Sequence, residues 1–434
     1  MLRGWGGVGV PAVERRSEDL VALTEDAVLS RGLGRSYGDS SLPPPSRPEA
    51  VNTTLGDRIL SFDPPSGVLR AEAGLSVLEL NRLFVPRGFF PPVSPGTQFV
   101  TLGGMVAADV HGANHHVDGC FGAHVTSLRM RVADGRIVDC GPERETDLFR
   151  ATVGGMGLTG HILEVAFRMK RIPSPWLFTE TERMEDIDAF MSGLRTAAKS
   201  WPWTKGWIDC LKRGKHLGRG VLFRARWAEP HEAPRHPPRA RPRPGVPFPL
   251  PFSFVSPLTV RAFNSLYYHL PRRARGIENP ESFLYPLDVV SNWNRLYGPR
   301  GFTQFQCVLP EAAGPDAARR FLQLLTRRGG ASMLCVIKDC GAEGVGLISF
   351  PRPGISIALD IAITGTTPAL VDALNEEVIA EGGRIYLAKD AFTRAEHFRA
   401  MEPRLDAFLA VRRRFDPEGR IRSVQSVRLF GDKP

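Results

Sequence analysis

Three glycine-rich segments lie in the first 160 residues, and they constrain the fold more than any other feature of the chain. They read RGLGRSYGD at residues 31–39, PGT and then TLGG at residues 95–97 and 101–104, and GGMGLTG at residues 154–160. Glycine at this density lets the backbone approach a ligand closely and point its N–H groups at phosphate oxygens. One such segment alone is more often a tight turn. The prediction of a ligand site therefore depends on all three.

The third segment contains GMGLTG at residues 155–160, which matches the GxGxxG fingerprint of dinucleotide-binding domains. In a Rossmann site a strand precedes the glycines and a helix follows them. Here a helix-like segment at 145–152 precedes them, and the alternating run at 161–169 predicts a strand after them. The order of these elements argues against a nicotinamide site of the Rossmann type.

Four histidines fall within 14 residues, and they are His111, His115, His116 and His124. His111 and His115 have the i, i+4 spacing of a helical metal-binding pair. Gly112 and Asn114 weaken a helix there, however, and no glutamate follows His111. We therefore predict no metal site and interpret this segment as a polar loop that lines a ligand pocket.

The basic charge of the chain is concentrated in one segment. Lysine and arginine total 56 against 46 acidic residues, a net charge of +10, and residues 212–244 hold ten basic residues and two acidic ones. Nine of the 22 residues at 230–251 are prolines, which favours a mobile or polyproline-II-like insert. The segment has few aromatic side chains for base stacking, so we predict no nucleic-acid binding. Because an apolar run with Phe248, Phe252 and Phe254 follows, we expect segment 212–256 to bind an anionic membrane surface.

Several protein classes are excluded by simple counts. The 434 residues suit two domains or one two-part fold, and no apolar run approaches the roughly 18 residues of a membrane span. The six cysteines lack a CxxC pair, which indicates free thiols. The first ten residues lack an apolar signal core, so we expect a peripheral location on the cytoplasmic side of a membrane, with a periplasmic location left open.

The hydrophobic periodicity predicts the main elements of both halves. Alternation predicts strands at 68–73 and 161–169, and later at 302–309, 332–337, 355–363 and 384–388. Helices are expected at 76–84 with Ser76 as N-cap, at 145–152, at 316–327, after a Thr367 cap, and at 396–414. These elements predict an α+β chain, in which short strands separated by glycines give way near residue 173 to an alternation of helices and strands.

Taken together and in this order, the motifs resemble the flavoproteins of the vanillyl-alcohol oxidase and p-cresol methylhydroxylase superfamily, and most closely the decaprenylphosphoryl-β-D-ribose 2'-oxidases. The motifs that carry the resemblance, besides the glycine segments, are DVHGANHH at 109–116, YPLD at 285–288, WNRLYGP at 293–299, QFQ at 304–306, AKD at 388–390 and VRR at 411–413. The resemblance covers nearly the whole chain apart from residues 218–280.

The resemblance implies a two-part FAD-binding domain of the p-cresol methylhydroxylase type and an α/β substrate domain whose antiparallel sheet covers the isoalloxazine ring. The expected boundaries are 1–173 for the FAD-binding domain, 174–383 for the substrate domain with a mobile insert at about 228–256, and 384–434 for a segment that returns to the FAD-binding domain. Many relatives attach the flavin covalently to a histidine in the first glycine loop. Here that neighbourhood reads Arg35-Ser36-Tyr37, so we expect non-covalent FAD.

The same resemblance implies the residues of the site. Those expected to contact FAD are Arg31, Gly32, Leu33, Gly34, Arg35, Ser36, Tyr37, Pro95, Gly96, Thr97, Thr101, Leu102, Gly103, Gly104, Asp109, His111, Gly112, Asn114, His115, Gly119, Gly122, Gly155, Gly157, Gly160, Ile162, Tyr386 and Lys389. Those expected to contact substrate are Trp207, Gln304, Gln306, Lys338, Ser356 and Ala358. Catalysis is assigned to His111, Lys389 and Tyr37, with the base left open between His111, Lys389 and solvent. Lys338 is expected to pair with a substrate phosphate.

Three positions depart from the family pattern. Ala113 replaces a lysine in the His-Gly-Lys-Asn loop, Leu284 replaces a tyrosine, and Ala358 replaces a cysteine that some members carry in the pocket. The loss of a cation and a phenol leaves both the lipid and the sugar open. The missing thiol predicts insensitivity to inhibitors that modify that cysteine.

The sequence therefore predicts FAD-dependent oxidation of a secondary hydroxyl of a polyprenyl-phosphate-linked pentose to a 2'-keto sugar. This would be the first half of an epimerisation, completed by a partner NAD(P)H-dependent keto-sugar reductase, that feeds arabinan or cell-wall glycan synthesis. The alternative enzyme is an FAD-dependent oxidase of a soluble sugar, alditol or aldonolactone. The alternative from another class is a nucleic-acid-binding protein that uses the basic segment.

Overall fold

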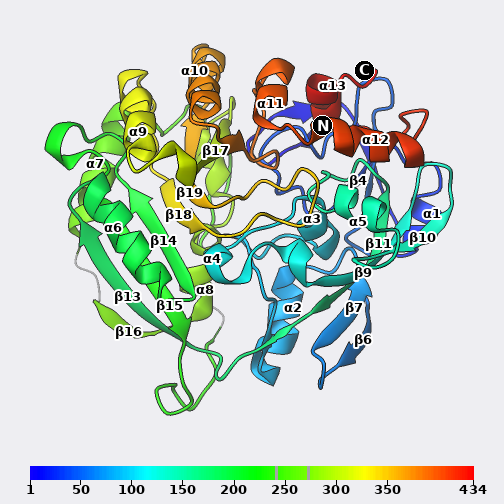
Figure 1. Ribbon diagram of the computed structural model, residues 1–434, viewed down its shortest axis with the longest axis horizontal. Coiled ribbons are helices and arrows are strands. Elements are labelled where there is room, and N and C mark those ends of the chain that lie inside the picture. The colour runs from blue at the N-terminus through cyan, green and yellow to red at the C-terminus, as the bar shows by residue number, and fades with distance from the viewer. Residues whose placement is uncertain (240–242, 271–273) are drawn as a thin grey trace.

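The computed structural model describes residues 1–239, 243–270 and 274–434, and it has an N-terminal part and a middle part that lie side by side beneath the C-terminal helices (Figure 1). The N-terminal part contains an antiparallel five-stranded sheet, in the order β10-β9-β11-β7-β6. Its strands are β6 (Ile59–Asp63), β7 (Val68–Glu72), β9 (Val125–Arg131), β10 (Ile137–Cys140) and β11 (His161–Arg168). A parallel three-stranded sheet contains β3 (Val13–Arg16), β4 (Ser30–Arg31) and β5 (Glu49–Asn52). Short helices α1 (Leu20–Leu23), α2 (Val77–Phe84), α3 (Leu102–Ala107), α4 (His115–Asp118) and α5 (Thr146–Thr152) connect these strands.

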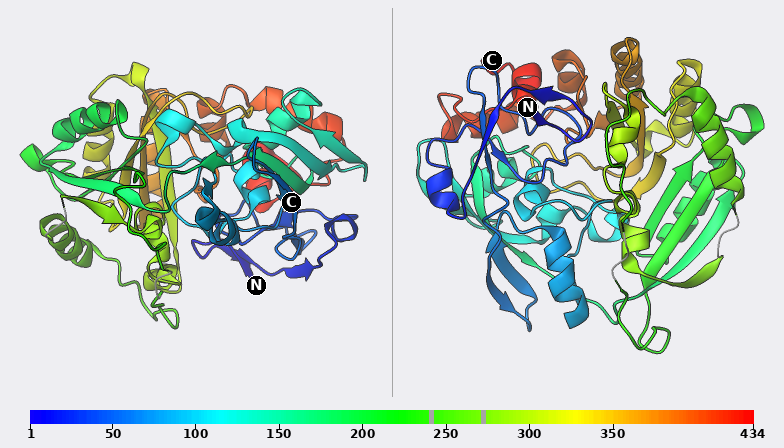
Figure 2. Two further views of the ribbon diagram at one scale, coloured as in Figure 1. Left: turned by 90° about the horizontal axis from the view of Figure 1, so that it is seen from below. Right: turned by 180° about the vertical axis from the view of Figure 1, so that it is seen from behind.

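The middle part is built on one antiparallel sheet of eight strands in the order β16-β13-β15-β14-β18-β19-β17-β20. The strands are β13 (Leu177–Met184), β14 (Trp203–Ile208), β15 (Gly220–Trp227), β16 (Arg275–Glu278), β17 (Phe302–Pro310), β18 (Cys335–Cys340), β19 (Gly354–Ala362) and β20 (Arg384–Ile385). Helices α6 (Ile187–Ala198), α9 (Ala317–Arg327) and α10 (Thr367–Ala380) cover the outer face, and the inner face is turned to the N-terminal part (Figure 2).

The alternation along these strands decides which side chains face the helices. Phe305 and Cys307 of β17 and Ile337 of β18 belong to the hydrophobic core beneath the helices. Their neighbours Gln306 and Lys338 therefore point to the opposite, inner face, because successive side chains of a strand lie on opposite faces. The sequence pattern thus separates a buried core from a polar inner wall.

Most predicted elements are confirmed, including α2 with Ser76 as its N-cap and a strand, not a helix, after the GxGxxG segment. The single helix predicted at 396–414 is wrong, because the chain forms α11 (Ala395–Met401) and α12 (Leu405–Phe415) with a break at Pro403. Proline disfavours the helical conformation in the residue before it, and Glu402 has φ −122° and ψ 84°.

Three further boundaries differ from the prediction. The strand expected at 332–337 begins only at Cys335, because the Ser332 hydroxyl forms a turn with the backbone of Leu334. The strand expected at 384–388 ends at Ile385, where the chain turns back to the first glycine loop, and the Tyr37 amide donates to the Ala388 carbonyl. Helix α10 has Thr366, not Thr367, at its N-cap position.

The C-terminal helices lie over the N-terminal part, as Figure 1 shows in red. Helix α12 packs against α5, and Arg428 of α13 (Val424–Phe430) forms ion pairs with Asp39 and Asp390. Arg412 of α12 donates to the Leu158 carbonyl. These contacts tie the end of the chain to the first and third glycine segments.

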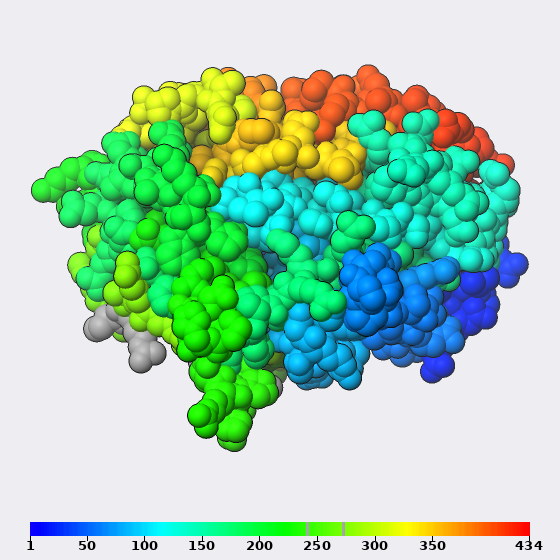
Figure 3. All heavy atoms as spheres, turned by 60° about the horizontal axis from the view of Figure 1, so that its bottom comes forward, coloured from blue at the N-terminus to red at the C-terminus, as the bar shows by residue number. Residues whose placement is uncertain are grey.

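The Pro/Arg-rich insert protrudes from the lower edge of the molecule (Figure 3, green). Residues 240–242, and with them Arg241, lie outside the described residues. The described part is fastened at both ends: Trp176 Nε1 donates to the His236 carbonyl, and the amide of Val246 donates to the Ser291 carbonyl.

The predicted basic segment is less uniform than its composition suggests. Arg219 forms a buried ion pair with Asp209, and Arg224, Arg226 and Arg243 pair with Glu182, Glu232 and Glu281. Four of the ten basic residues of the segment are therefore paired with acidic side chains. In the described part of the chain no helix has both the length and the apolar character needed to cross a bilayer.

Candidate active site

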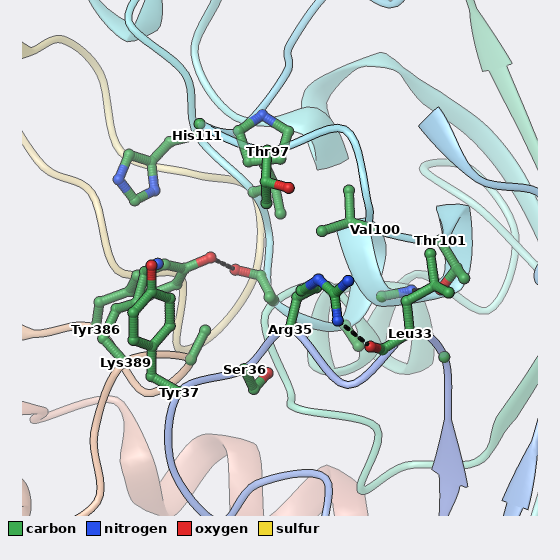
Figure 4. A pocket seen from close by; sticks show the side chains of 18 of the residues that line it. Leu33, Arg35, Ser36, Tyr37, Thr97, Val100, Thr101, His111, Tyr386 and Lys389 are labelled. Carbon is green, nitrogen blue, oxygen red and sulfur yellow. Dashed lines mark hydrogen bonds between the residues drawn. The ribbon is translucent and has the colours of Figure 1, made fainter. Parts of the chain in front are cut away.

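One large cavity lies between the glycine segments and the inner face of the eight-stranded sheet. It holds about 1880 Å³ of space between protein atoms, including solvent at its mouth. Residues of all three glycine segments line one wall, and β14, β17, β18 and β19 supply side chains to the other. Figure 4 shows His111, Tyr386, Lys389 and Tyr37 on one side of this space and Leu33, Arg35, Val100 and Thr101 on the other.

The first glycine loop offers the cavity a row of free amides. None of the five backbone N–H groups from Gly32 to Ser36 has an acceptor among the described residues. Successive amides of this kind form a nest for phosphate oxygens. Gly32 leaves the loop no room for a side chain, because a Cβ there would lie 2.3 Å from Thr101 Oγ1. Gly34 has φ +63°, which favours glycine. The loop therefore fits the pyrophosphate of a dinucleotide cofactor.

The second glycine segment is held in place from the middle part of the chain. Asp288 accepts hydrogen bonds from Thr97 Oγ1 at 2.6 Å and from the Gln98 amide at 2.8 Å. The Tyr285 hydroxyl lies 2.7 Å from Ser94 Oγ. The YPLD motif thus fixes the loop that faces the cavity.

The structure places most of the predicted cofactor contacts on the cavity wall. The exceptions are Leu102, Asp109, Asn114, His115, Gly119, Gly122 and Gly155, which do not line it. Asp109, with φ +39°, accepts from the Gly122 amide and from Ser349, and His115 accepts from the Gly341 amide. Asp109 and His115 therefore hold loops behind the wall. Because α4 begins only at His115, His111 and His115 do not share a helix, and the spacing considered for a metal does not form a helical pair.

His111 is buried and surrounded by polar and aromatic groups. Gln306 Nε2 lies 2.9 Å from His111 Nε2, and His111 Nδ1 has no partner among the described residues. Burial lowers the pKa of His111 well below its usual range, and the positive charges of Lys338 and Lys389 lower it further. The imidazole is therefore neutral at physiological pH.

Lys389 lies with its ammonium 3.8 Å from the centre of the Tyr37 ring. Burial lowers the pKa of Lys389 to about 7, although Asp360 acts in the opposite direction. Burial likewise raises the pKa of Asp360 to about 7, opposed by its hydrogen bond from Gln304 at 2.5 Å. The pKa of Tyr37 is raised well above its usual range by burial, so its hydroxyl stays protonated. Lys389 on the cavity wall and the buried Asp360 thus form an acid–base pair whose pKa values lie near neutral pH.

Part of the predicted substrate set lies on the sheet wall. Gln304, Gln306, Lys338 and Ala358 line the cavity. Trp207 and Ser356 do not line it. Trp207 Nε1 donates to the Met333 carbonyl at 2.9 Å, and Ser356 Oγ accepts from Gln306 at 3.1 Å. Ser356 therefore orients a cavity residue from behind.

Sequence reasoning missed two ionisable side chains at this wall: Lys205, which lines the cavity, and Asp360, which is buried behind the wall and accepts from Gln304. Lys205 lines the cavity from β14, two residues before Trp207 and therefore on the same face of the strand. The amide of Thr204 donates to the Ala113 carbonyl, so Lys205 lies next to the position at which the expected lysine is absent. Only the pairing of β14 with β18 shows that this face of the strand borders the cavity, and Asp360 follows the cavity-lining Ala358 by two residues on β19.

Comparison with known proteins agrees with this division of the cavity. Residues 19–141 match the FAD binding domain family. The chain is 33% identical to the decaprenylphosphoryl-β-D-ribose oxidase of Mycolicibacterium smegmatis, over 99% of this chain and 97% of that protein. It is 34% identical to an uncharacterized protein of Streptomyces coelicolor, over 82% of this chain and 100% of that protein. A putative D-arabinono-1,4-lactone oxidase of Neurospora crassa is 29% identical, over 32% of this chain and 25% of that protein. The whole-length similarity includes both walls, whereas the similarity to the lactone oxidase covers about a third of the chain.

Proposed function

The chain belongs to the decaprenylphosphoryl-β-D-ribose oxidase family and is an FAD-dependent oxidoreductase that acts on a CH–OH group, and from this premise we propose that it oxidises a secondary hydroxyl of a polyprenyl-phosphate-linked pentose to a 2'-keto sugar. The observation that carries the proposal is the cavity, in which a phosphate-binding glycine loop faces a sheet wall with lysine and glutamine side chains. The relative in Mycolicibacterium smegmatis is named for a substrate of this class.

The glycine wall supplies the cofactor contacts. The amides of residues 32–36 would hold the pyrophosphate, and Thr101 and Gly157 line the same wall. When bound, FAD accepts the hydride from the carbinol carbon. We propose that FAD is non-covalent, because the first loop contains neither histidine nor cysteine and His111 is the one histidine among the described residues that line the cavity. Flavin released into the supernatant by acid precipitation would test this.

The substrate hydroxyl must lose its proton as the hydride leaves. Lys389 is the group best suited to accept it, because a base is most effective when its pKa lies near the working pH. His111 is poorly suited as the base, since its pKa is far below neutrality and the Gln306 amide occupies Nε2. We assign His111 Nδ1–H as a donor to the substrate oxygen, and Tyr37 as the ring that positions Lys389.

We also propose that the enzyme docks on an anionic membrane surface beside its lipid-linked substrate. Phe248 and Phe252 of the insert are more than 60% exposed, and Leu258 and Leu266 of α7 (Pro257–His269) are equally exposed. Exposed apolar residues at this density mark an interaction surface. The cavity-lining residues Pro286 and Leu287 are separated by Asp288 alone from another exposed pair, Val289 and Val290. A polyprenyl chain would leave the cavity toward this apolar surface.

The product would be a 2'-keto sugar still linked to lipid phosphate. Oxidation to a keto sugar is the first step of an epimerisation. We therefore propose that a partner NAD(P)H-dependent reductase reduces the keto group and completes the epimerisation for arabinan or cell-wall glycan synthesis. The competing function is oxidation of a soluble sugar, alditol or aldonolactone. The partial similarity to a putative lactone oxidase supports this alternative.

One experiment separates the two functions. The purified yellow holoenzyme is mixed anaerobically with a polyprenyl-phosphoryl pentose or with free alditols and aldonolactones, and the flavin absorbance is followed. We expect rapid bleaching by the lipid-linked pentose alone. Bleaching by the free alditols and not by the lipid-linked sugar would overturn the proposal.

A further inference from the structure

Two lysines face each other across neighbouring strands of the sheet wall. Gly206 and Trp207 of β14 pair with Ile337 and Val336 of β18, and continuing this antiparallel register by one residue places Lys205 opposite Lys338. Both side chains line the cavity. Like charges in directly opposed positions destabilise a sheet. Such a pair needs an explanation in what the cavity binds.

The two ammonium groups have more donors than the protein uses. Lys205 donates one hydrogen bond, to the Phe283 carbonyl at the end of α8 (Pro280–Leu284), and its ammonium lies 4.2 Å from the Phe283 ring centre. Lys338 has no hydrogen bond and no ion pair among the described residues. Each ammonium carries three donors, so most of them are left for a ligand. Capping of α8 therefore accounts for one donor of Lys205, and no contact in the described part of the chain accounts for the donors of Lys338.

The surroundings favour an anion between the two side chains. Burial is the largest cause that lowers the pKa of each lysine, Lys205 to about 7, and the charge of Lys338 lowers the pKa of Lys205 further. No carboxylate forms an ion pair with either one in the described part of the chain. An anionic ligand would restore the charge of both lysines, because an opposite charge favours the ionised form.

The position of the pair separates it from the expected site of the cofactor phosphates. Those would lie at the loop of residues 32–36 on the opposite wall, whereas Lys338 lies close enough to lower the pKa of both His111 and Lys389. An anion held by Lys205 and Lys338 would thus lie next to the groups that we assign to the reacting alcohol. A substrate whose phosphate ester is attached to the carbon beside the oxidised carbinol would place its phosphate and its reacting hydroxyl next to each other in this way.

We propose that Lys205 and Lys338 form a subsite for the phosphate ester of the substrate, in which Lys205 supplies a cation from β14. The proposal rests on the proposed function, since it assumes that the substrate is a phosphorylated sugar. The phosphate is either the diester of a polyprenyl-phosphoryl sugar or the monoester of a free sugar phosphate, because both present oxygens to the same two lysines.

The first test compares holoenzyme variants Lys205→Met, Lys338→Met and Lys205→Arg with the control Lys199→Met, an exposed lysine on the opposite side of the sheet. The substrates are a polyprenyl-phosphoryl pentose, a pentose 1-phosphate and a free alditol. Loss of one charged hydrogen bond should raise KM for the phosphorylated substrates about 10- to 100-fold. We expect kcat of Lys205→Met to change less than about threefold, Lys205→Arg to retain most of the affinity, and the control to behave as the wild type.

The outcomes are distinct. An equal loss with the free alditol and the phosphorylated sugars would overturn the subsite and leave Lys205 as a cap of α8. An unchanged KM in Lys205→Met would also overturn it. Preference for the lipid-linked sugar over the pentose 1-phosphate, or the reverse, identifies the source of the phosphate and supports the subsite in either case.

A binding measurement keeps this proposal separate from the proposed function. Calorimetric titration of the wild-type holoenzyme with farnesyl phosphate, and with inorganic phosphate, needs no turnover. If no phosphorylated sugar bleaches the flavin, the proposed function fails. The subsite still stands if both ligands bind the wild type and bind Lys205→Met at least about tenfold more weakly, and it is refuted if they bind both proteins equally or do not bind at all.

Discussion

The two walls of the cavity recognise ligands by different means. The glycine wall presents backbone amides, and its shape depends on the absence of side chains at positions such as Gly32 and Gly34. The sheet wall presents side chains from every second residue of four strands. Backbone recognition leaves few alternatives at each position, whereas a side chain on a strand can be exchanged without moving the strand. Of the three departures from the family pattern, Ala358 lies on β19 of the sheet wall, Ala113 and Leu284 line the cavity from outside these strands, and none lies in the three glycine segments.

The comparisons follow the same division. The FAD binding domain match ends at residue 141 and therefore contains the first two glycine segments and none of the large sheet. The cofactor is accordingly established by the first wall. The identity of the substrate depends on the rest of the cavity, where Ala113, Leu284 and Ala358 replace a cation and polar groups of the family pattern.

If the glycine wall binds the cofactor through its backbone, the largest effect is expected when a side chain is added to that wall. In Gly32→Val the new Cβ would overlap Thr101 Oγ1, which caps α3 by accepting from the Gly104 amide and is buried. We expect a folded protein that retains less than about a tenth of its flavin, measured as absorbance at the flavin band relative to protein, with thermal unfolding as the check of folding.

The matched control for this change is Gly365→Val. Gly365 is exposed and a Cβ there would meet no atom within 4 Å, so full flavin content is expected. Normal flavin in Gly32→Val would mean that the first loop does not hold the pyrophosphate.

The next largest effect concerns the residue where the two walls meet. Lys389→Met removes the proposed proton acceptor but keeps a side chain of similar length over Tyr37. Loss of general-base catalysis should lower kcat about 10²- to 10⁴-fold while FAD remains bound. Lys199→Met serves again as the control, and a decrease below about threefold would exclude Lys389 as the base.

The pH profile of the wild type gives an independent check of that assignment. Lys389 accepts a proton only when neutral, and burial lowers its pKa to about 7. The value of kcat should therefore be constant above about pH 7 and fall tenfold for each unit below it. A flat profile between pH 5 and 8 would contradict the role of Lys389.

A smaller effect is expected outside both walls, on the apolar surface of the insert. Phe248→Ser/Phe252→Ser removes two exposed aromatic side chains that we expect to enter an anionic phospholipid vesicle. Each buried aromatic contributes about 1.5–3 kcal/mol, so vesicle affinity in a flotation assay should decrease at least about tenfold with unchanged flavin content.

Leu60→Ser is the control for vesicle binding, because Leu60 is also exposed but lies on β6 in the N-terminal part. Equal vesicle binding by the double variant and the wild type would remove the membrane from the proposed function and leave both walls of the cavity unaffected.

Some parts of the fold and of the site could be predicted from the sequence, and others could not, for physical reasons. The glycine loops were recognised because backbone contacts impose residue types at fixed spacing. Gln304 and Gln306 were expected in the pocket from the family resemblance, and their spacing by two placed them on one face of a strand. The broken helix at Pro403 and the late start of β18 depended on local backbone chemistry that the apolar pattern does not record. Lys205 was missed because a lysine in a strand is usually solvated, and only the pairing of β14 with β18 shows that it faces a cavity.

The smallest effect is expected when a side chain of the sheet wall is replaced. This prediction tests whether that wall tolerates substitutions better than the glycine wall does. Ala358 lines the cavity, and Ala358→Cys adds one sulfur atom at this position without a charge. We expect kcat to change less than about threefold, and a thiol-reactive ligand that enters the cavity to form an adduct at residue 358 that intact mass and peptide mapping detect. The wild type, whose six cysteines are all buried, should show no adduct at this position and remain insensitive to such a ligand. A large loss of activity in Ala358→Cys would mean that the sheet wall is as tightly constrained as the glycine wall, and that the difference between them does not account for where this chain departs from its family.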